Sequence, residues 1–313
     1  MKIIIIFLCL ASNAYTQWKL TVNFGGGFLH GTAYELVYLD EINDTLLSEL
    51  QWKLQPLWYM QSSFHGEYKK FFADISFKWG FPGKTGTMED RDWQDRNNPY
   101  SLTNFSSHTN DTNTVLLCDI YTGYLFSLRK RNLSFSIYGT FSYWYFSWQA
   151  QDGYTQYANS DQQGNYQPWT SDIPKSPLYG TGISYSQTWQ SLGSGVALTV
   201  PIAPTVQITG GSFISFVFSA VGEDTHFFTQ AQYRDTINKG LVVEPYGILT
   251  WLLHDKYSFD IRCAYRVYAQ TRGKAEARTT GSQSSGAYSS FGSVGGASLG
   301  VWDISLTAHI KLF

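Results

Sequence analysis

The stretch KKFFADISFKWGF, residues 69–81, decides the fold class. From Phe71 to Phe81 every second residue is apolar, and the residues between them include Asp74 and Lys78. Because successive side chains of a strand point to opposite faces, one face is apolar and the other carries charge. Runs beginning at residues 256 and 302 repeat the pattern. Soluble strands average about five or six residues, so these longer runs are typical of a transmembrane barrel with a polar lumen.

The connections between these runs alternate between short and long. The short ones lie near residues 65, 129, 201 and 253. The longer, more polar ones lie near residues 40–47, 84–112, 151–178, 222–240 and 272–295. Outer-membrane barrels have an even number of strands, short periplasmic turns and long extracellular loops. The sequence therefore predicts an all-β fold, a ten-stranded antiparallel transmembrane β-barrel with five extracellular loops.

Composition and the N-terminal residues indicate an exported protein. Charged residues make up 15% of the 313 residues, whereas about 25% is usual in soluble domains. The apolar run IIIIFLCLA, residues 3–11, is too short for a spanning helix and predicts a cleaved signal peptide over residues 1–14. Residues 15–313 would then form one barrel domain. The formal net charge of −2 argues against a nucleic-acid partner.

Two cysteines remain outside the predicted signal peptide. Cys118 and Cys263 both fall in the apolar phase of their runs, on expected strands that are not neighbours. A disulfide requires Cα atoms within about 7 Å of each other. We therefore expect two free cysteines that face lipid.

The stretch MEDRDWQDRNNP, residues 88–99, crowds three aspartates around a tryptophan. Asp90, Asp92 and Asp95 could form a solvated loop, a cation site or a catalytic pair. An EF-hand loop that began at Asp90 would need Gly and Glu where the chain has Asp95 and Ser101. The EF-hand is therefore rejected, whereas a looser cation site stays open.

A second acid–base element is GEDTHF, residues 222–227. In an extended chain Asp224 and His226 project the same way, so Asp224 can orient the imidazole ring and raise its basicity. A solvated loop pair is the alternative interpretation. Continuing the alternation that includes Phe218 would place both side chains toward lipid, which is too costly. We therefore expect the strand to bulge, twist or leave the membrane near Gly222.

Together these elements resemble the omptins, the outer-membrane proteases of Gram-negative bacteria. The likeness rests on the block GTMEDRDWQD, residues 86–95, and on the distant EDTH, residues 223–226. It covers almost all of the expected mature chain and extends to Glu35 in ELVYL, LQWK at 50–53, Asn98-Pro99 and His108.

The resemblance implies an active-site groove at the rim of a barrel in the bacterial outer membrane, facing the exterior. Asp224 would orient His226, and His226 with Asp90 would activate a water molecule that attacks the peptide bond. Asp92 would assist by sharing a proton with Asp90. The resemblance implies peptide or protein substrates, and no covalent intermediate, cofactor or metal. We also expect a monomer.

On the substrate side, the resemblance implies that Glu35 holds a P1 arginine or lysine and that Met88 contributes to substrate binding. The family's second P1 carboxylate falls at Gly222, for which Glu223 is the expected substitute. Its acidic P1′ position is occupied by Asn104. A basic P1 residue is therefore expected, without a strict requirement for a dibasic site.

The lipopolysaccharide site of the family is not evident. The matching run GTFSYWY, residues 139–145, contains neither Glu nor Arg. We expect the barrel to contact outer-membrane lipid without those residues.

Two alternatives to an omptin-type protease remain. A non-proteolytic barrel, either an adhesin or a small pore, could keep the fold without the activity. A hydrolase of another class could also use the Asp224–His226 pair.

Overall fold

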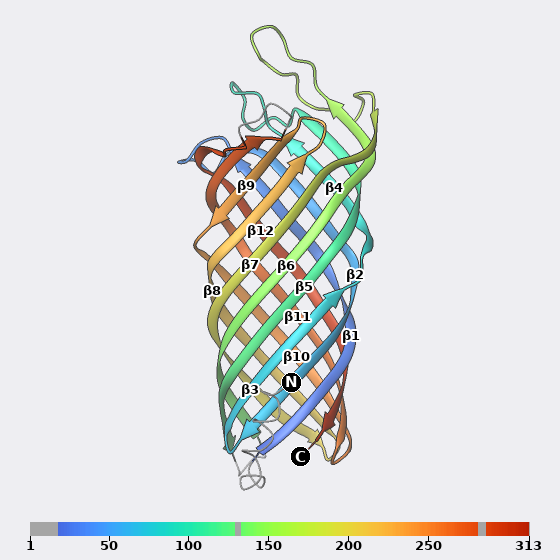
Figure 1. Cartoon of the computed structure of the whole chain (residues 1–313), viewed down its shortest axis with the longest axis vertical. Coiled ribbons are helices and arrows are strands. Elements are labelled where there is room, and N and C mark those ends of the chain that lie inside the picture. The colour runs from blue at the N-terminus through green and yellow to red at the C-terminus, as the bar shows by residue number, and fades with distance from the viewer. Residues whose placement is uncertain (1–17, 129–132, 281–285, 313) are drawn as a thin grey trace.

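The computed structural model describes residues 18–128, 133–280 and 286–312, whose regular structure is all β-strand (Figure 1). None of these residues forms a helix long and apolar enough to cross a membrane. The predicted signal peptide, residues 1–14, lies outside them. The strands are β1 (Trp18–Tyr38), β2 (Leu46–Tyr68), β3 (Phe71–Gly80), β4 (Gly83–Asp92), β5 (Asn104–Leu128), β6 (Leu133–Tyr157), β7 (Ser176–Ala203), β8 (Val206–His226), β9 (Ala231–Ile237), β10 (Gly240–His254), β11 (Tyr257–Thr279) and β12 (Ser289–Lys311).

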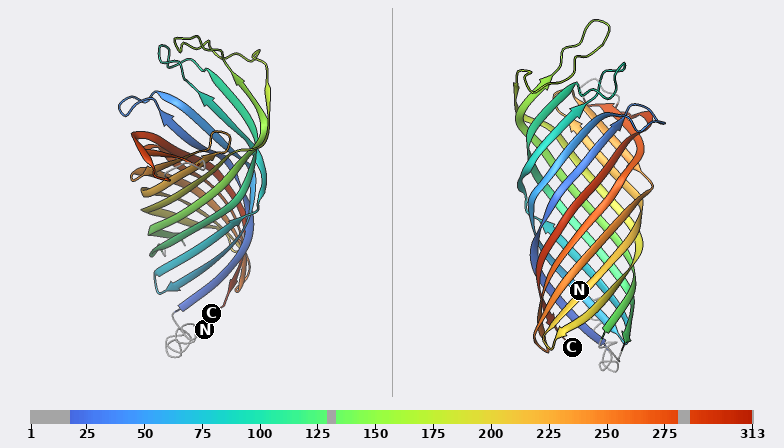
Figure 2. Two further views of the ribbon diagram at one scale, coloured as in Figure 1. Left: turned by 45° about the horizontal axis from the view of Figure 1, so that its top comes forward. Right: turned by 180° about the vertical axis from the view of Figure 1, so that it is seen from behind.

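The twelve strands form one antiparallel sheet that closes into a barrel, seen from two further sides in Figure 2. β1 pairs with β2 on one side and with β12 on the other. Closure pairs the backbone groups that an open sheet would leave at its edges. The sequence predicted ten strands where the structure has twelve, because two further strands, β4 and β9, form within the expected loops. β3 and β4 both lie between β2 and β5, and β9 and β10 both lie between β8 and β11.

β1 begins and β12 ends at the lower end of the barrel in Figure 1, where the tight turns also lie. Turns at residues 69–70, 204–205 and 255–256 confirm three of the predicted short connections. The fourth, near residue 129, falls partly outside the described residues.

The predicted long loops at 84–112, 222–240 and 272–295 have the wrong bounds. The first contains β4 and the start of β5, and the second contains β9. The third contains the end of β11 and the start of β12. These strand segments belong to the upper part of the barrel, beyond the band of outward-facing apolar side chains. Apolar alternation marks the part of a strand that faces lipid, whereas backbone pairing continues beyond it.

The lower barrel is apolar outside and charged inside. Large exposed apolar side chains on its outer face include Phe71, Phe77, Trp79, Leu192, Ile214, Phe216, Trp251, Ile261 and Leu306. The lumen holds a charge-balanced network of three acids and three bases, which are Asp119, Glu244, Asp303, Lys78, Arg262 and Arg266. Arg266 is 1% exposed and lies 2.9 Å from Asp119, and it also contacts Glu244. The predicted polar lumen is thus confirmed.

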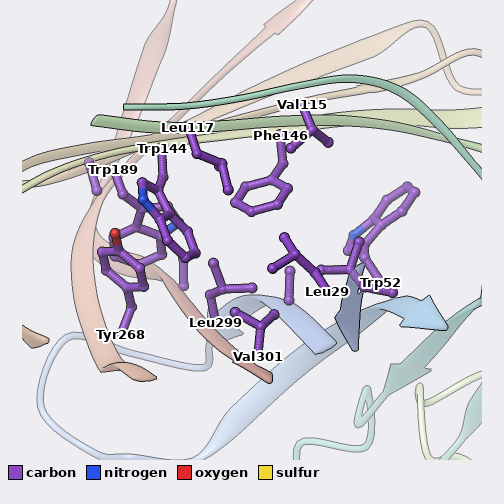
Figure 3. Packing of buried hydrophobic residues seen from close by; sticks show 14 of the residues in the cluster. Leu29, Trp52, Val115, Leu117, Trp144, Phe146, Trp189, Tyr268, Leu299 and Val301 are labelled. Carbon is purple, nitrogen blue, oxygen red and sulfur yellow. The ribbon is translucent and has the colours of Figure 1, made fainter. Parts of the chain in front are cut away.

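A layer of apolar and aromatic side chains lies next to this network and fills the interior of the barrel (Figure 3). Trp144 connects the two, because the guanidinium of Arg266 lies 3.9 Å from the centre of its ring. Tyr268 packs against Trp144 and Trp189, with ring centres 5.8 and 4.6 Å away. Side chains therefore occupy the lumen at this level, as expected for a narrow barrel.

The two cysteines are free and lie on β5 and β11, which do not pair with each other. Cys263 is exposed, and Cys118 is partly exposed beside the buried, inward-facing Asp119. The prediction that they form no disulfide is confirmed.

A β-bulge in β8 changes which residues face inward. Ser219 pairs with Gln190 and Val217 with Ser191, so Phe218 has no partner on β7. Below the bulge the buried positions are odd-numbered, as at Val217, and above it they are even-numbered, as at Ala220 and Asp224. The expected bulge near Gly222 is therefore confirmed, four residues earlier in the chain. An extra residue in one strand of a pair has this effect on side-chain direction.

Deleting single residues would test this bulge. Removing Phe218 should leave a regular ladder in which Val217 and Ala220 still point inward. Removing Thr188 from the regular strand opposite should instead turn one flank of β7 to the wrong face. We expect the first variant to keep heat-modifiable gel migration and near-native resistance to urea, and the second to lose much of that resistance. Equal damage from both deletions would contradict the assignment.

Candidate active site

β4 directs two aspartates toward the barrel interior above the apolar layer. Asp90 pairs with Leu50 of β2 and Ser106 of β5, both buried. The hydroxyl of Ser48 donates a long hydrogen bond of 3.4 Å to Asp90 Oδ1. Burial and the charge of Asp92 raise the pKa of Asp90 to about 8, and burial also raises the pKa of Asp92. The two carboxyls are thus held where joint ionisation is costly.

Asp95 has a separate, structural role. Its Oδ1 accepts hydrogen bonds from the backbone N–H groups of Asn97 and Asn98, at 2.9 and 3.3 Å. It therefore stabilises the turn that follows β4, and only Asp90 and Asp92 remain as candidates for chemistry.

β8 supplies the histidine and its partner. Nε2 of His226 lies 2.6 Å from Oδ2 of Asp224, which is 2% exposed. Burial is the largest influence on His226 and lowers its pKa. The contact with Asp224 and the charges of the two β4 aspartates outweigh burial, so the pKa of His226 lies above its usual value.

An aromatic stack joins the two elements. Trp52 pairs with Met88 of β4, and Tyr185 pairs with Asp224 of β8. The Trp52 and Tyr185 rings stack with their centres 5.4 Å apart, and Trp148 packs against both rings. The charges of Asp90 and Asp92 act on His226 across this stack. The sequence-predicted catalytic residues are therefore brought together.

Among the predicted substrate-binding residues, Glu35 joins this group. It is 6% exposed, and its Oε2 has no hydrogen-bond partner. Burial and the charges of Asp224, Asp235 and Asp90 raise the pKa of Glu35 well above its usual value.

The other three predicted substrate-binding residues differ in position. Asn104 is buried directly opposite Asp92. Met88 is fully buried and belongs to the apolar cluster beneath the carboxyls. Residues next to each other in a strand project to opposite faces, so Glu223 points away from the face that carries Asp224. On its own face Glu223 accepts a hydrogen bond of 2.7 Å from Arg234. The structure therefore does not bring Glu223 to Glu35.

Two residues at the site were not found from the sequence. Asp235 of β9 is 9% exposed, and burial and the charge of Asp224 raise its pKa to about 8. Tyr233, also on β9, packs edge-on against His226 with ring centres 5.3 Å apart. No motif marks either residue, and their positions depend on the register of β9 against β8.

Asp–His contacts also occur at the opposite end of the barrel. His65 lies 2.9 Å from Asp74, and His309 lies 3.0 Å from Asp260. All four residues line a cavity of about 400 Å³ in the lower lumen, which no candidate catalytic residue lines. An Asp–His contact alone therefore does not define the site. Within the described residues, no three His, Cys, Asp or Glu side chains are arranged to hold a metal ion.

Comparison with known proteins agrees with this architecture. A sequence profile described as the Omptin family matches residues 16–305. The chain belongs to the omptin family. The omptins are outer-membrane proteases, as the sequence resemblance indicated. A search of curated proteins found no match to the sequence.

The fold of this omptin is similar to that of the outer membrane protease OmpT from Escherichia coli. The TM-score is 0.82 at 17% identity, and the match covers 94% of this chain and 97% of that one. The translocator domain of the autotransporter NalP from Neisseria meningitidis matches with a TM-score of 0.38 at 10% identity, over 93% of this chain and 88% of that one.

Replacing the histidine's partner gives a test of the site's electrostatics. In an Asp224→Asn variant, burial would be opposed only by the charges of the two β4 aspartates, so the pKa of His226 should fall. NMR titration of the imidazole nitrogens in detergent micelles would measure it, with a His226→Ala variant to assign the signal. An unchanged titration would contradict the contact.

Proposed function

We propose that this omptin is an outer-membrane endopeptidase that hydrolyses peptide bonds with an activated water molecule and prefers a basic P1 residue. The observation that carries this function is the contact of Asp224 with His226, within reach of the charges of Asp90 and Asp92. Family membership supports a protease. The buried Glu35, whose Oε2 has no hydrogen-bond partner among the described residues, supports a cationic P1 side chain.

In the proposed mechanism His226 and Asp90 remove a proton from the attacking water, and the resulting hydroxide adds to the scissile carbonyl. Asp224 orients the ring and stabilises its charged form. Asp92 shares a proton with Asp90, whose pKa of about 8 makes proton transfer near neutral pH feasible. Collapse of the tetrahedral intermediate returns a proton to the leaving amine. The proposal needs no covalent intermediate, metal or cofactor.

We propose that the catalytic end faces the exterior of the cell. The tight turns, the start of β1 and the end of β12 lie at the opposite end of the barrel. Short turns face the periplasm in outer-membrane barrels, which supports this orientation. We also propose that the protein acts as a monomer on peptide or protein substrates. Lipid contact would not require a Glu or Arg in the run at 139–145.

The rival function is a barrel that is not a protease. A small pore is disfavoured, because the charge-balanced network and the layer of Trp144, Trp189 and Tyr268 fill the lumen. An adhesin would tolerate a filled lumen. It would give no reason to bury carboxyls next to a histidine, where each costs free energy unless it is paired or neutral.

A fluorogenic peptide library with the refolded protein in several lipids would test the function. We expect cleavage after Arg or Lys, and a loss of about 100-fold or more in His226→Ala and Asp90→Ala, because a general base contributes this much. A matched control is His65→Ala, whose histidine contacts Asp74 at the other end of the barrel and should leave the rate unchanged. No cleavage by wild type in any lipid would refute the protease, whereas equal rates in all variants would refute the mechanism.

The pH profile gives a second test. The value of kcat/KM should increase with pH as the His226–Asp90 pair loses its proton. The charge of Asp92 raises the pKa of both groups. Replacing Asp92 with Asn should therefore move this increase to lower pH, by about one unit for the loss of one nearby charge. A shift to higher pH would contradict the assigned electrostatics.

A further inference from the structure

Two buried carboxyls beside the catalytic histidine lack a cation. Glu35 and Asp235 are 6% and 9% exposed, and the largest charges that act on them from the described residues are those of other acids, above all Asp224. Oε2 of Glu35 has no hydrogen-bond partner in the described chain. Buried charges are otherwise paired or neutral. The arrangement therefore favours the entry of a cation that the protein itself does not supply.

Strand pairing places Asp235 on the same face as the catalytic residues. It lies directly opposite Gly222, two residues before Asp224. Directly opposed residues of an antiparallel pair project to one side of the sheet. A Cβ atom at position 222 would lie 3.0 Å from the hydroxyl of Tyr185, so the glycine leaves this part of the face without a side chain.

The carboxyl of Asp235 extends toward β12 and β1. The backbone N–H of Gly296 donates a hydrogen bond to it, and a Cβ atom at position 295 would collide with it. Gly296 pairs with Leu36, the neighbour of Glu35. Asp235 therefore approaches Glu35 from the far side of β12, and its charge acts on Glu35.

Glu223, the acid expected from the sequence in this role, is already neutralised. Glu223 lies on the opposite face of β8 and pairs with Arg234, whose guanidinium also packs over the ring of Tyr288. Glu223 is therefore not available to a side chain that enters beside Glu35.

We propose that Asp235 is a specificity-determining residue that binds, together with Glu35, the guanidinium or ammonium group of the substrate's P1 residue. This inference rests on the proposed function. A cation between the two carboxylates replaces their mutual repulsion with charge-assisted hydrogen bonds. A neutral P1 side chain of the same shape leaves both acids buried without a partner, which is how a polar pocket rejects an isostere.

The test compares two fluorogenic peptides that differ only at P1, one with arginine and the other with its neutral isostere citrulline. In Asp235→Asn, the wild-type preference for arginine in kcat/KM should fall about tenfold or more. The preference in Glu223→Gln should equal that of wild type. In the double variant Asp235→Asn with Gly222→Asp, which moves the carboxyl to the facing position, the preference should be partly restored. An unchanged preference in Asp235→Asn would overturn the proposal.

A binding measurement separates this inference from the proposed function. The same two peptides, with a reduced and uncleavable P1–P1′ bond, would be followed by fluorescence anisotropy. We expect Asp235→Asn to weaken the arginine peptide and to leave the citrulline peptide unchanged. This result would stand even if wild type cleaved neither peptide, in which case the protease proposal alone would fail. Equal weakening of both peptides would indicate a structural role and overturn the inference.

Discussion

Period-two alternation is the constraint on which the rest of this structure depends. The lower part of each strand must present apolar side chains outward, and the same strands must direct polar side chains inward in the upper part. In β8 the extra residue at Phe218 reconciles the two requirements. β5 uses the same device, because a register shift beside Asn113 separates inward-facing Thr112 from inward-facing Val115. Without the shift in β8, Asp224 would point away from the barrel interior.

The barrel interior separates acids that are paired with bases from acids that are not. In the lower lumen each buried acid contacts a buried base, as Asp119 contacts Arg266. Above the apolar layer, Asp90, Glu35 and Asp235 have no such base, and their pKa values are raised. The layer of Trp144, Trp189 and Tyr268 lies next to the charge network, and Tyr185 of the upper aromatic stack pairs with Asp224. A base next to each upper acid would lower the pKa of that acid, which would then stay deprotonated near neutral pH.

The sequence predicts the barrel and the inward charges, because each depends on spacing along one strand. The four proposed catalytic residues follow from the resemblance to the omptins. The shared direction of Asp224 and His226 follows from their i, i+2 spacing, and their inward direction requires one bulge. The bounds of the upper strands could not be predicted, since the apolar pattern ends where lipid ends although pairing continues. The direction of Glu223 follows from the same alternation once Asp224 is known to face inward. Asp235 could not be found at all, because its place depends on the register of β9.

Register explains how a pocket can keep its chemistry while a motif changes. Positions 222 and 235 are direct cross-strand partners, and the Cβ atoms of such partners lie about 4.5–5.5 Å apart. A carboxyl can therefore move from one strand to its neighbour and still reach nearly the same point. Gly222 leaves this part of the face without a side chain, and a Cβ atom there would lie 3.0 Å from the hydroxyl of Tyr185. In the sequence, position 222 lacks the acid expected from the omptin resemblance. In the sheet, Asp235 lies directly opposite that position.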